Sequence, residues 1–326
     1  MALILSAAQV RDLLDMREAI DAVERALVEF SSGQAVMPVR STTQVPAHAG
    51  LMLSMPAFLG KTDALGSKIV TVYKGNPQRG LPTILAVVVL NDPQTGRVLA
   101  VMDGAYLTAV RTAAASGAAT RHLAPPGPKT LAILGAGVQG ASHLWAMREV
   151  AQVTRVRLYN RSRERAEAFK RDLEPRFGVP IDVVGSAEDA VRGADLAVLA
   201  TTATAPIVRW PWFKAGCHIN AVGSHSPGAR ELDSDTVAAA RVVVDSREAN
   251  FTECGDILVP LQEGRITREQ VADEIGEVIA GAKPGRQHPE QVTVYKSVGI
   301  AVEDVATANL VYRKAVARGV GTEVDL

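Results

Sequence analysis

The hydrophobic positions form two different patterns along the chain, one with helical periodicity and one of short apolar runs. Over residues 16–31, apolar side chains recur at helical spacing, which predicts an amphipathic helix that ends before Gly33. An alanine-rich helix is expected over residues 105–123. Between these two helices, short apolar runs predict strands at residues 51–55, 69–73, 84–90 and 98–102.

Turn-forming residues mark the ends of several of these elements. Ser6 and Gln9 have the spacing of a capping box and predict a short helix after Ser6. The sequence Asn-Asp-Pro-Gln-Thr-Gly at residues 91–96 predicts a hairpin between two strands. The proline-rich stretch 124–128 should end the alanine-rich helix and predicts a domain boundary there.

From residue 130 onward, short buried strands alternate with helices. The apolar strands are expected at residues 131–134, 156–159, 181–184, 196–200, 219–222 and 242–244. This alternation predicts an α/β fold class, a Rossmann-type doubly wound parallel sheet. A last helix over residues 297–318 is expected to pack back onto the N-terminal part. We therefore expect an α+β domain of residues 1–123 with 297–326, and a Rossmann NAD(P)-binding domain of residues 124–296.

A glycine-rich motif opens the second part. Gly135, Gly137 and Gly140 form a GxGxxG pattern, with Val138 and Gln139 between the last two glycines. The motif follows an apolar strand and begins a predicted helix, which is the context of a dinucleotide fingerprint. The helix N-terminus would offer free N–H groups to a pyrophosphate.

The residues after the next strand indicate which dinucleotide is preferred. An NAD site usually has an acidic residue about 20 positions after the motif, whereas this chain has Asn160, Arg161 and Ser162. Asn160 removes the repulsion that a carboxylate would exert on a 2′-phosphate, and Arg161 and Ser162 can donate hydrogen bonds to it. The sequence thus predicts NADPH rather than NADH.

Composition narrows the function classes. The chain of 326 residues has 35 Lys and Arg against 35 Asp and Glu, so nucleic acid is not an expected partner. The two cysteines, Cys217 and Cys254, form no Cys-x-x-Cys pair, and we expect core thiols rather than a metal site or a disulfide scaffold. No apolar run is long enough for a membrane span or a signal peptide, so a cytoplasmic protein without a membrane partner is expected.

Three cations of the N-terminal part lie among apolar or small residues: Arg40, Lys68 and Arg111. Lys68 begins an apolar run, and Arg111 lies within the alanine-rich helix. A cation in such surroundings either faces solvent or pairs with an anion. From spacing alone, both possibilities remain open for each of the three.

Several stretches together carry a resemblance to a known family. They are residues 37–40, 55–57, 66–70, 80–82, 103–104, 108–112, 135–140, 220–224 and 297–304. On these stretches, the chain resembles the ornithine cyclodeaminase/μ-crystallin family over essentially its whole length. The resemblance implies a homodimer in which the first domain binds substrate and forms the dimer contact. It also implies that Arg40, Lys68 and Arg111 converge on a substrate carboxylate.

The resemblance further places Val222, Ser224, Val298 and Gly299 near the nicotinamide. Cyclodeaminases of this family carry acidic residues where this chain has Leu53 and His225. Without those carboxylates, the distal ammonium of ornithine would be buried unpaired, which is costly. The 160–162 stretch instead looks like the NADPH-using ketimine reductase branch.

The expected reaction is reduction of the C=N bond of an α-imino acid to the L-amino acid. Candidate substrates are cyclic imines such as pyrroline-2-carboxylate or piperideine-2-carboxylate. Lys68 is the first candidate proton donor and His225 the second, since both can titrate near neutrality. Three alternatives remain: an ornithine or lysine cyclodeaminase with tightly bound NAD, an alanine-dehydrogenase-like enzyme, and an NADPH-dependent small-ligand-binding protein.

Overall fold

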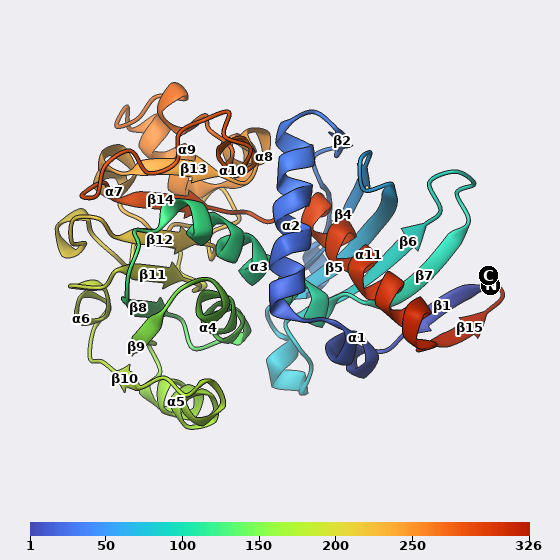
Figure 1. Ribbon diagram of the computed structural model, residues 1–326. Helices are drawn as coiled ribbons and strands as arrows, with labels where there is room; N and C mark the ends of the chain where they lie inside the picture. Colours follow the sequence, from blue (N-terminus) through green and yellow to red (C-terminus); the bar gives the residue numbers. More distant parts are fainter. The chain divides into compact units, whose positions relative to one another are not determined.

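A computed structural model describes residues 1–326, which fall into two units (Figure 1). Unit 1 comprises Met1–Arg111 and Ile300–Leu326, and unit 2 comprises Thr112–Gly299. Their first boundary lies within helix α3 (Ala105–Leu123) rather than at the proline-rich stretch that follows it. The side chains explain this position, because Arg111 pairs with residues of unit 1 whereas Ser116 hydrogen-bonds within unit 2.

Unit 1 is built on an eight-stranded sheet with the order β15-β1-β7-β6-β5-β4-β2, and β3 pairs with β4. Its strands are β1 (Ala2–Leu5), β2 (Ala35–Val36), β3 (Ser41–Val45), β4 (Gly50–Leu59), β5 (Ala64–Tyr73), β6 (Ile84–Asn91), β7 (Val98–Asp103) and β15 (Thr322–Val324). Its helices are α1 (Ala7–Leu13), α2 (Met16–Ser31), α11 (Ala301–Arg318) and the first part of α3.

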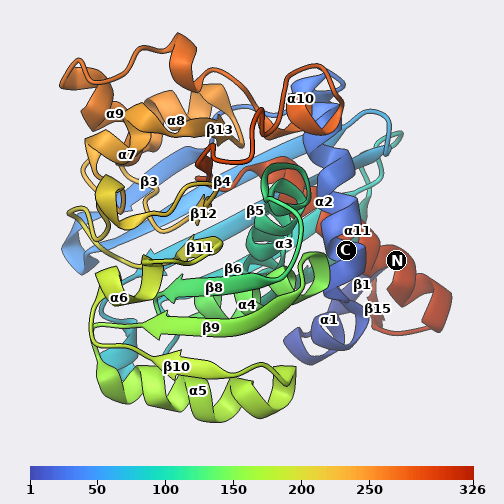
Figure 2. The same cartoon turned by 60° about the vertical axis from the view of Figure 1, so that its left-hand side comes forward.

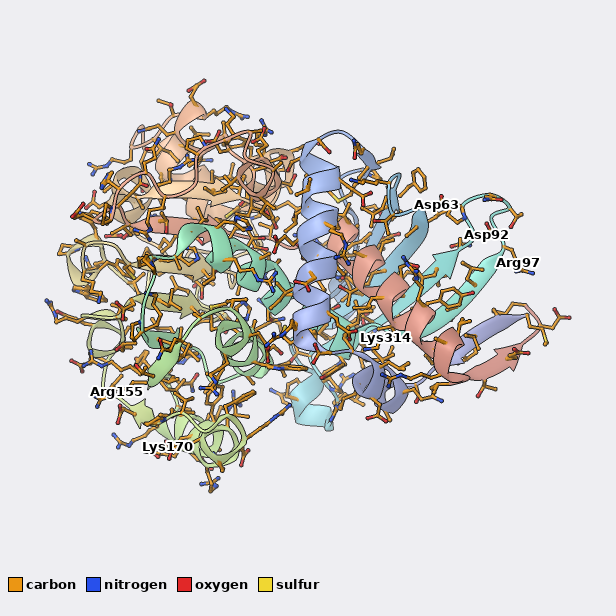
Figure 3. All side chains as sticks on the ribbon, viewed as in Figure 1. Asp63, Asp92, Arg97, Arg155, Lys170 and Lys314 are labelled. Carbon is orange, nitrogen blue, oxygen red and sulfur yellow. The ribbon has the colours of Figure 1, made fainter.

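Helices α2 and α11 lie side by side against one face of this sheet (Figure 1). Lys314 of α11, labelled in Figure 3, forms an ion pair with Glu18 of α2. Along β5, Lys68 and Val70 are buried while Ile69 between them is exposed. Because neighbouring residues of a strand point to opposite faces, Lys68 lies on the face that the helices cover.

Several elements of unit 1 confirm the sequence patterns. The capping box at Ser6 is present, with the Ser6 N–H donating to Gln9 Oε1 over 2.9 Å. Helix α2 has the predicted bounds, and residues 91–96 connect β6 to β7. Strands β4 and β5 are longer than predicted because Pro56 and several polar residues interrupt their apolar pattern. Helix α11 returns to unit 1, as expected.

Unit 2 contains a seven-stranded, wholly parallel sheet with the order β10-β9-β8-β11-β12-β14-β13. The strands are β8 (Lys129–Leu134), β9 (Val153–Tyr159), β10 (Ile181–Val183), β11 (Leu196–Leu199), β12 (His218–Ala221), β13 (Arg241–Val244) and β14 (Thr293–Lys296). Figure 2 shows β8, β9 and β10 running in the same direction. The strand order reverses between β8 and β11, as in a doubly wound fold.

The helices of unit 2 connect and cover these strands. They are α4 (Val138–Val150), α5 (Arg163–Phe177), α6 (Ala187–Val191), α7 (Ser234–Ala239), α8 (Arg247–Glu253), α9 (Gly255–Gln262), α10 (Ile275–Ile279) and the second part of α3. None of the helices is long and apolar enough to span a bilayer. The predicted α/β class with a doubly wound sheet is confirmed.

One strand of the parallel sheet was not predicted from the sequence. Strand β14 inserts between β12 and β13 and ends at a buried lysine, Lys296. The helix expected over residues 297–318 begins at Ala301 because residues 297–300 form a turn that follows β14. This turn joins the parallel sheet of unit 2 to α11 in the chain.

Candidate active site

Lys68 lies in the middle of β5, and only 1% of its surface is exposed. Its Nζ is 2.8 Å from Oδ1 and 2.8 Å from Oδ2 of Asp304. Asp304 belongs to the first turn of α11, where the helix dipole also favours negative charge. The buried ammonium therefore has a buried anion from the chain itself as its partner.

Arg111 joins the same cluster from α3. Its Nε donates to Asp304 Oδ1 over 2.8 Å, and its Nη1 donates to Glu303 Oε2 over 2.6 Å. All four side chains are at least nine-tenths buried. One carboxylate, Asp304, is thus shared by both cations, and we call Lys68, Arg111, Glu303 and Asp304 the charge cluster of unit 1.

Burial and charge together determine the protonation of the cluster. Burial and, to a smaller extent, the nearby Arg111 lower the pKa of Lys68 to about 8, although Asp304 acts in the opposite direction. Burial by itself would lower the pKa of Arg111, but the two carboxylates outweigh this effect and raise it. The cluster therefore contains one permanent cation and one lysine that can exchange a proton near neutral pH.

Arg40 lies just before β3, and its side chain is half-buried. The next residue, Ser41, pairs with Ser54 of β4, and the adjacent Met55 pairs with Lys68 of β5. The register therefore places Arg40 about two strand spacings, or ~10 Å, from Lys68.

The glycine-rich loop of unit 2 follows β8 and leads into α4. Gly135 has a φ of +114°, and a Cβ there would lie 2.4 Å from the carbonyl oxygen of Ala200. A Cβ on Gly140 would lie 2.1 Å from the carbonyl oxygen of Gly135. Both positions thus require glycine for the loop and helix to pack together.

The middle of this loop has room for a ligand. A Cβ on Gly137 would meet no atom within 4 Å, and no side chain caps the N-terminus of α4, which begins at Val138. Val138 is 71% exposed, and the buried Oε1 of Gln139 has no hydrogen-bond partner. Open space beside uncapped helix N–H groups fits a dinucleotide pyrophosphate.

The residues after β9 are arranged around Asn160. Asn160 Oδ1 accepts from the N–H of Ala136 over 3.2 Å, and Nδ2 donates to the carbonyl of Ser162 over 2.9 Å. Ser162 caps α5, while Arg161 is exposed. Asn160 therefore ties the glycine-rich loop to the following loop, and Arg161 extends into solvent beside them.

The loop after β12 contains three of the predicted residues. Val222 is half-buried, and its N–H donates to the carbonyl of Leu199 over 2.9 Å. The hydroxyl of the buried Ser224 donates to the carbonyl of Ala229. His225 is exposed, and its Nδ1 lies 3.1 Å from the carbonyl oxygen of Gly223. Lys68 and His225, the two candidate acids, belong to different units.

The turn after β14 rests on a residue that sequence reasoning missed. Asp245 follows β13 and is fully buried. Its Oδ2 accepts from the N–H groups of Val298 and Gly299 over 2.8 Å each and from Ser297 Oγ over 2.9 Å. These N–H groups therefore bind Asp245, and the carboxylate holds the turn in shape.

Other functional candidates were also missed. Glu303 and Asp304 are two adjacent acids at the start of a largely apolar helix, which is the signal that points to them. Glu231, Asp256 and Lys296 form a buried group near the ends of β12 and β14. Cys217 and Cys254 are core residues, as predicted, and burial raises the pKa of each thiol to about 12.

Comparison with known proteins identifies the family of the chain. Residues 1–319 match the model of the ornithine cyclodeaminase/mu-crystallin family. The chain belongs to this family. The matched residues lie in both units and include those of the charge cluster and of the glycine-rich loop.

Two curated relatives in the family are similar along nearly all of their length. The chain is 42% identical over 324 residues to a Delta(1)-pyrroline-2-carboxylate reductase from Bacillus cereus, covering 99% of each chain. It is 44% identical over 312 residues to the ketimine reductase mu-crystallin of Mus musculus, covering 94% of this chain and 96% of that protein.

A solved structure of the family resembles the whole fold. It is that of Thermococcus litoralis Delta(1)-pyrroline-2-carboxylate reductase in complex with NADH and L-proline. The TM-score is 0.96 at 43% sequence identity, and the match covers 99% of this chain and 100% of that one.

Proposed function

We propose that this protein is a nicotinamide-dependent reductase of cyclic α-imino acids, which it converts to L-amino acids. The charge cluster of unit 1 carries this proposal, because it contains two buried cations of which one, Lys68, can exchange a proton. The full-length similarity to two kinds of imine reductase supports it. Unit 1 then binds the imino acid and unit 2 binds the cofactor.

The cluster can hold a carboxylate even though its cations are already paired. A lysine has three N–H donors and an arginine has five, and the contacts with Asp304 and Glu303 use only part of this capacity. Charge-assisted bonds to a carboxylate are the strong ones, and the fork of Arg111 suits its planar shape. We assign the substrate carboxylate to Arg111 and Lys68, with Arg40 as the third donor.

The imine nitrogen needs a proton for reduction at its carbon. When bound, a reduced nicotinamide supplies the hydride for that carbon. We assign the proton to Lys68, because its pKa of about 8 keeps it largely protonated at pH 7 yet able to release a proton. His225 is the second candidate donor.

A direct assay tests this function. Purified protein with pyrroline-2-carboxylate or piperideine-2-carboxylate should oxidise NADPH and yield proline or pipecolate, respectively, as the L-enantiomer. The measurement is the loss of absorbance at the nicotinamide band, together with chiral analysis of the product. Ammonia release from ornithine with no imine-dependent oxidation would instead identify a cyclodeaminase, and binding of either imine without turnover would identify a binding protein.

We further propose that NADPH is preferred over NADH. Asn160 offers no negative charge to a 2′-phosphate, and the exposed Arg161 beside it can pair with one. The similar Thermococcus litoralis structure contains NADH, and we assign the preference for NADPH to residues of this chain such as Arg161.

The variant Arg161→Ala tests the preference. Loss of a charge-assisted bond should raise KM for NADPH about tenfold, in line with the strength of such bonds, and leave KM for NADH nearly unchanged. Arg163→Ala is the matched control, since Arg163 faces Glu167 on α5 with their charged atoms 3.4 Å apart. Equal changes for both cofactors in Arg161→Ala would refute the contact with the 2′-phosphate.

A homodimer is the assembly that we propose. The sheet face opposite α2 and α11 carries apolar side chains on three adjacent strands. Among them, Met52 is 38%, Ile69 39% and Leu85 43% exposed. Exposed apolar side chains on one sheet face favour an interaction site there, and a second copy of the same face is the simplest symmetric partner.

A further inference from the structure

Glu231 is a fully buried carboxylate that joins two loops of unit 2. Its Oε1 accepts from the N–H of Thr201 over 2.8 Å and from Thr201 Oγ1 over 2.7 Å. Its Oε2 accepts from the N–H of Gly223 over 2.7 Å. Thr201 follows β11 and Gly223 follows β12, so one side chain connects the ends of two central strands.

The contact with Gly223 is too close for any other residue. A Cβ at Gly223 would lie 2.4 Å from Glu231 Oε1 and 2.3 Å from the carbonyl oxygen of Thr201. The carboxylate therefore packs directly on the backbone of both loops. Its three hydrogen bonds couple its position to the backbone of both loops.

These loops continue the edge formed by the glycine-rich loop. Ala200, next to Thr201, has its carbonyl oxygen 2.4 Å from the position of a Cβ on Gly135. The loops after β8, β11 and β12 therefore lie in a row, because these strands are neighbours in the sheet. Doubly wound sheets bind their ligands at the carboxyl ends of the strands, where the strand order reverses.

We propose that Glu231 is a positioning residue for the nicotinamide cofactor, which fixes the loops after β11 and β12 in the conformation that binds it. It does so as the ionised carboxylate, since only that form accepts from all three donors without a competing O–H. The inference rests on the cofactor named in the proposed function, but not on the imine or on the proton donor.

Burial, modified by the charges around Glu231, places the ionisation of this carboxylate near neutral pH. Burial raises the pKa of Glu231 to about 7, Lys296 acts to lower it, and Asp256 acts to raise it. Asp256 accepts from the backbone N–H of Glu231 over 2.8 Å, and its Oδ2 lies 3.3 Å from Lys296 Nζ. Cys254, also near Lys296, is a neutral thiol, since burial raises its pKa to about 12. Arg230 is turned toward Glu263, with their charged atoms 3.6 Å apart.

The ionisation of Glu231 determines the direction in which the affinity for the cofactor changes with pH. If the bound state requires the ionised carboxylate, binding releases a proton from those molecules in which Glu231 is protonated. The affinity for the cofactor then falls as the pH drops through 7. For one linked proton, Kd should be about tenfold higher at pH 6 than at pH 8.

The experiment is calorimetric titration of the full-length protein with NADH at pH 6, 7 and 8. NADH is the probe because it has no 2′-phosphate that titrates in this range, and no imine is present. In Glu231→Gln, the amide N–H₂ cannot accept from the backbone donors, so we expect Kd at pH 8 to rise about 10- to 100-fold. The remaining affinity should no longer depend on pH.

Controls separate this role from general effects. Glu248→Gln removes an exposed carboxylate of α8 and should retain both the affinity and its pH dependence. His225→Asn should also retain the pH dependence, although His225 touches the Gly223 carbonyl. A wild-type Kd that is constant from pH 6 to 8 overturns the proposal even if Glu231→Gln does not fold. A pH dependence that survives in Glu231→Gln and disappears in His225→Asn also overturns it.

The failure of this proposal differs from failure of the proposed function. If the protein reduces imines but its affinity for NADH does not change with pH, only the role of Glu231 is refuted. A protein that binds NADH with the expected pH dependence but reduces no imine would refute only the reaction. Circular dichroism of each variant shows whether the fold is intact.

Discussion

Replacing Lys68 by alanine should lower kcat for imine reduction by about 10²- to 10⁴-fold, the range of a general acid. Lys68 is the buried group of the charge cluster that titrates near neutrality, and its loss removes both a proton source and a donor to the substrate carboxylate. Dinucleotide binding should persist, because the glycine-rich loop belongs to the other unit. Steady-state kinetics and NADPH titration measure the two effects separately.

The lowered pKa of Lys68 also predicts how the rate of imine reduction changes with pH. The acid must be protonated, and the pKa of Lys68 is lowered to about 8, so wild-type kcat/KM should decrease as the pH rises above about 8. This limb should be absent from the residual activity of Lys68→Ala.

Two further variants make the test of Lys68 sharper. Lys68→Met keeps most of the side-chain volume and separates the loss of charge from a cavity in the sheet. Lys74→Ala removes an exposed lysine just after β5 and should retain wild-type kinetics. Unchanged turnover in a folded Lys68→Met variant would show that another group supplies the proton.

Replacing Gly140 by alanine should disrupt the glycine-rich loop and weaken dinucleotide binding about 10- to 100-fold. The added Cβ would lie 2.1 Å from the carbonyl oxygen of Gly135, so helix α4 or the loop has to shift. Overpacking of this kind costs about 1–3 kcal/mol, and every 1.4 kcal/mol changes an equilibrium constant about tenfold. Calorimetry with NADPH and thermal unfolding without it measure the two consequences.

Gly137, in the same motif, should respond differently to alanine than Gly140 does. A Cβ on Gly137 meets no atom within 4 Å, so Gly137→Ala should unfold at the wild-type temperature. It should nevertheless bind NADPH less tightly, because the methyl group occupies the space where the pyrophosphate approaches. Gly75→Ala in unit 1 also adds a methyl group to open space and should change neither property. Wild-type affinity in Gly137→Ala would mean that the phosphates bind elsewhere.

The structure changes the interpretation of the buried cations. In the sequence, Lys68 and Arg111 are cations in apolar surroundings whose partners are unknown. In the fold, Glu303 and Asp304 pair with them, so the cluster of two cations and two anions is neutral when all four are charged. Removing one partner of such a buried group is expected to cost about 3–5 kcal/mol of stability, which is why each variant needs a check of its fold.

Much of the fold is determined by local patterns in the sequence. The apolar spacing over residues 16–31 and the capping pattern at Ser6 predicted helices that the structure contains. The glycine-rich motif predicted a turn after β8 and a helix from Val138 to Val150, and both are present. These predictions succeed because periodicity, capping and positive-φ glycines are properties of residues only a few positions apart. Strand β14 was missed because it is only four residues long and ends in a lysine.

Only the tertiary structure decided which charged groups meet. Lys68 and Asp304 are separated by 236 positions in the chain, and they touch because α11 returns to cover β5. Glu231 binds Thr201 and Gly223 because β11 and β12 are neighbours in the sheet, and Asp245 holds the turn at Val298 for a similar reason. A buried carboxylate is stable only where folding supplies its donors. Such partners are set by strand order and helix packing, which no local spacing in the sequence records.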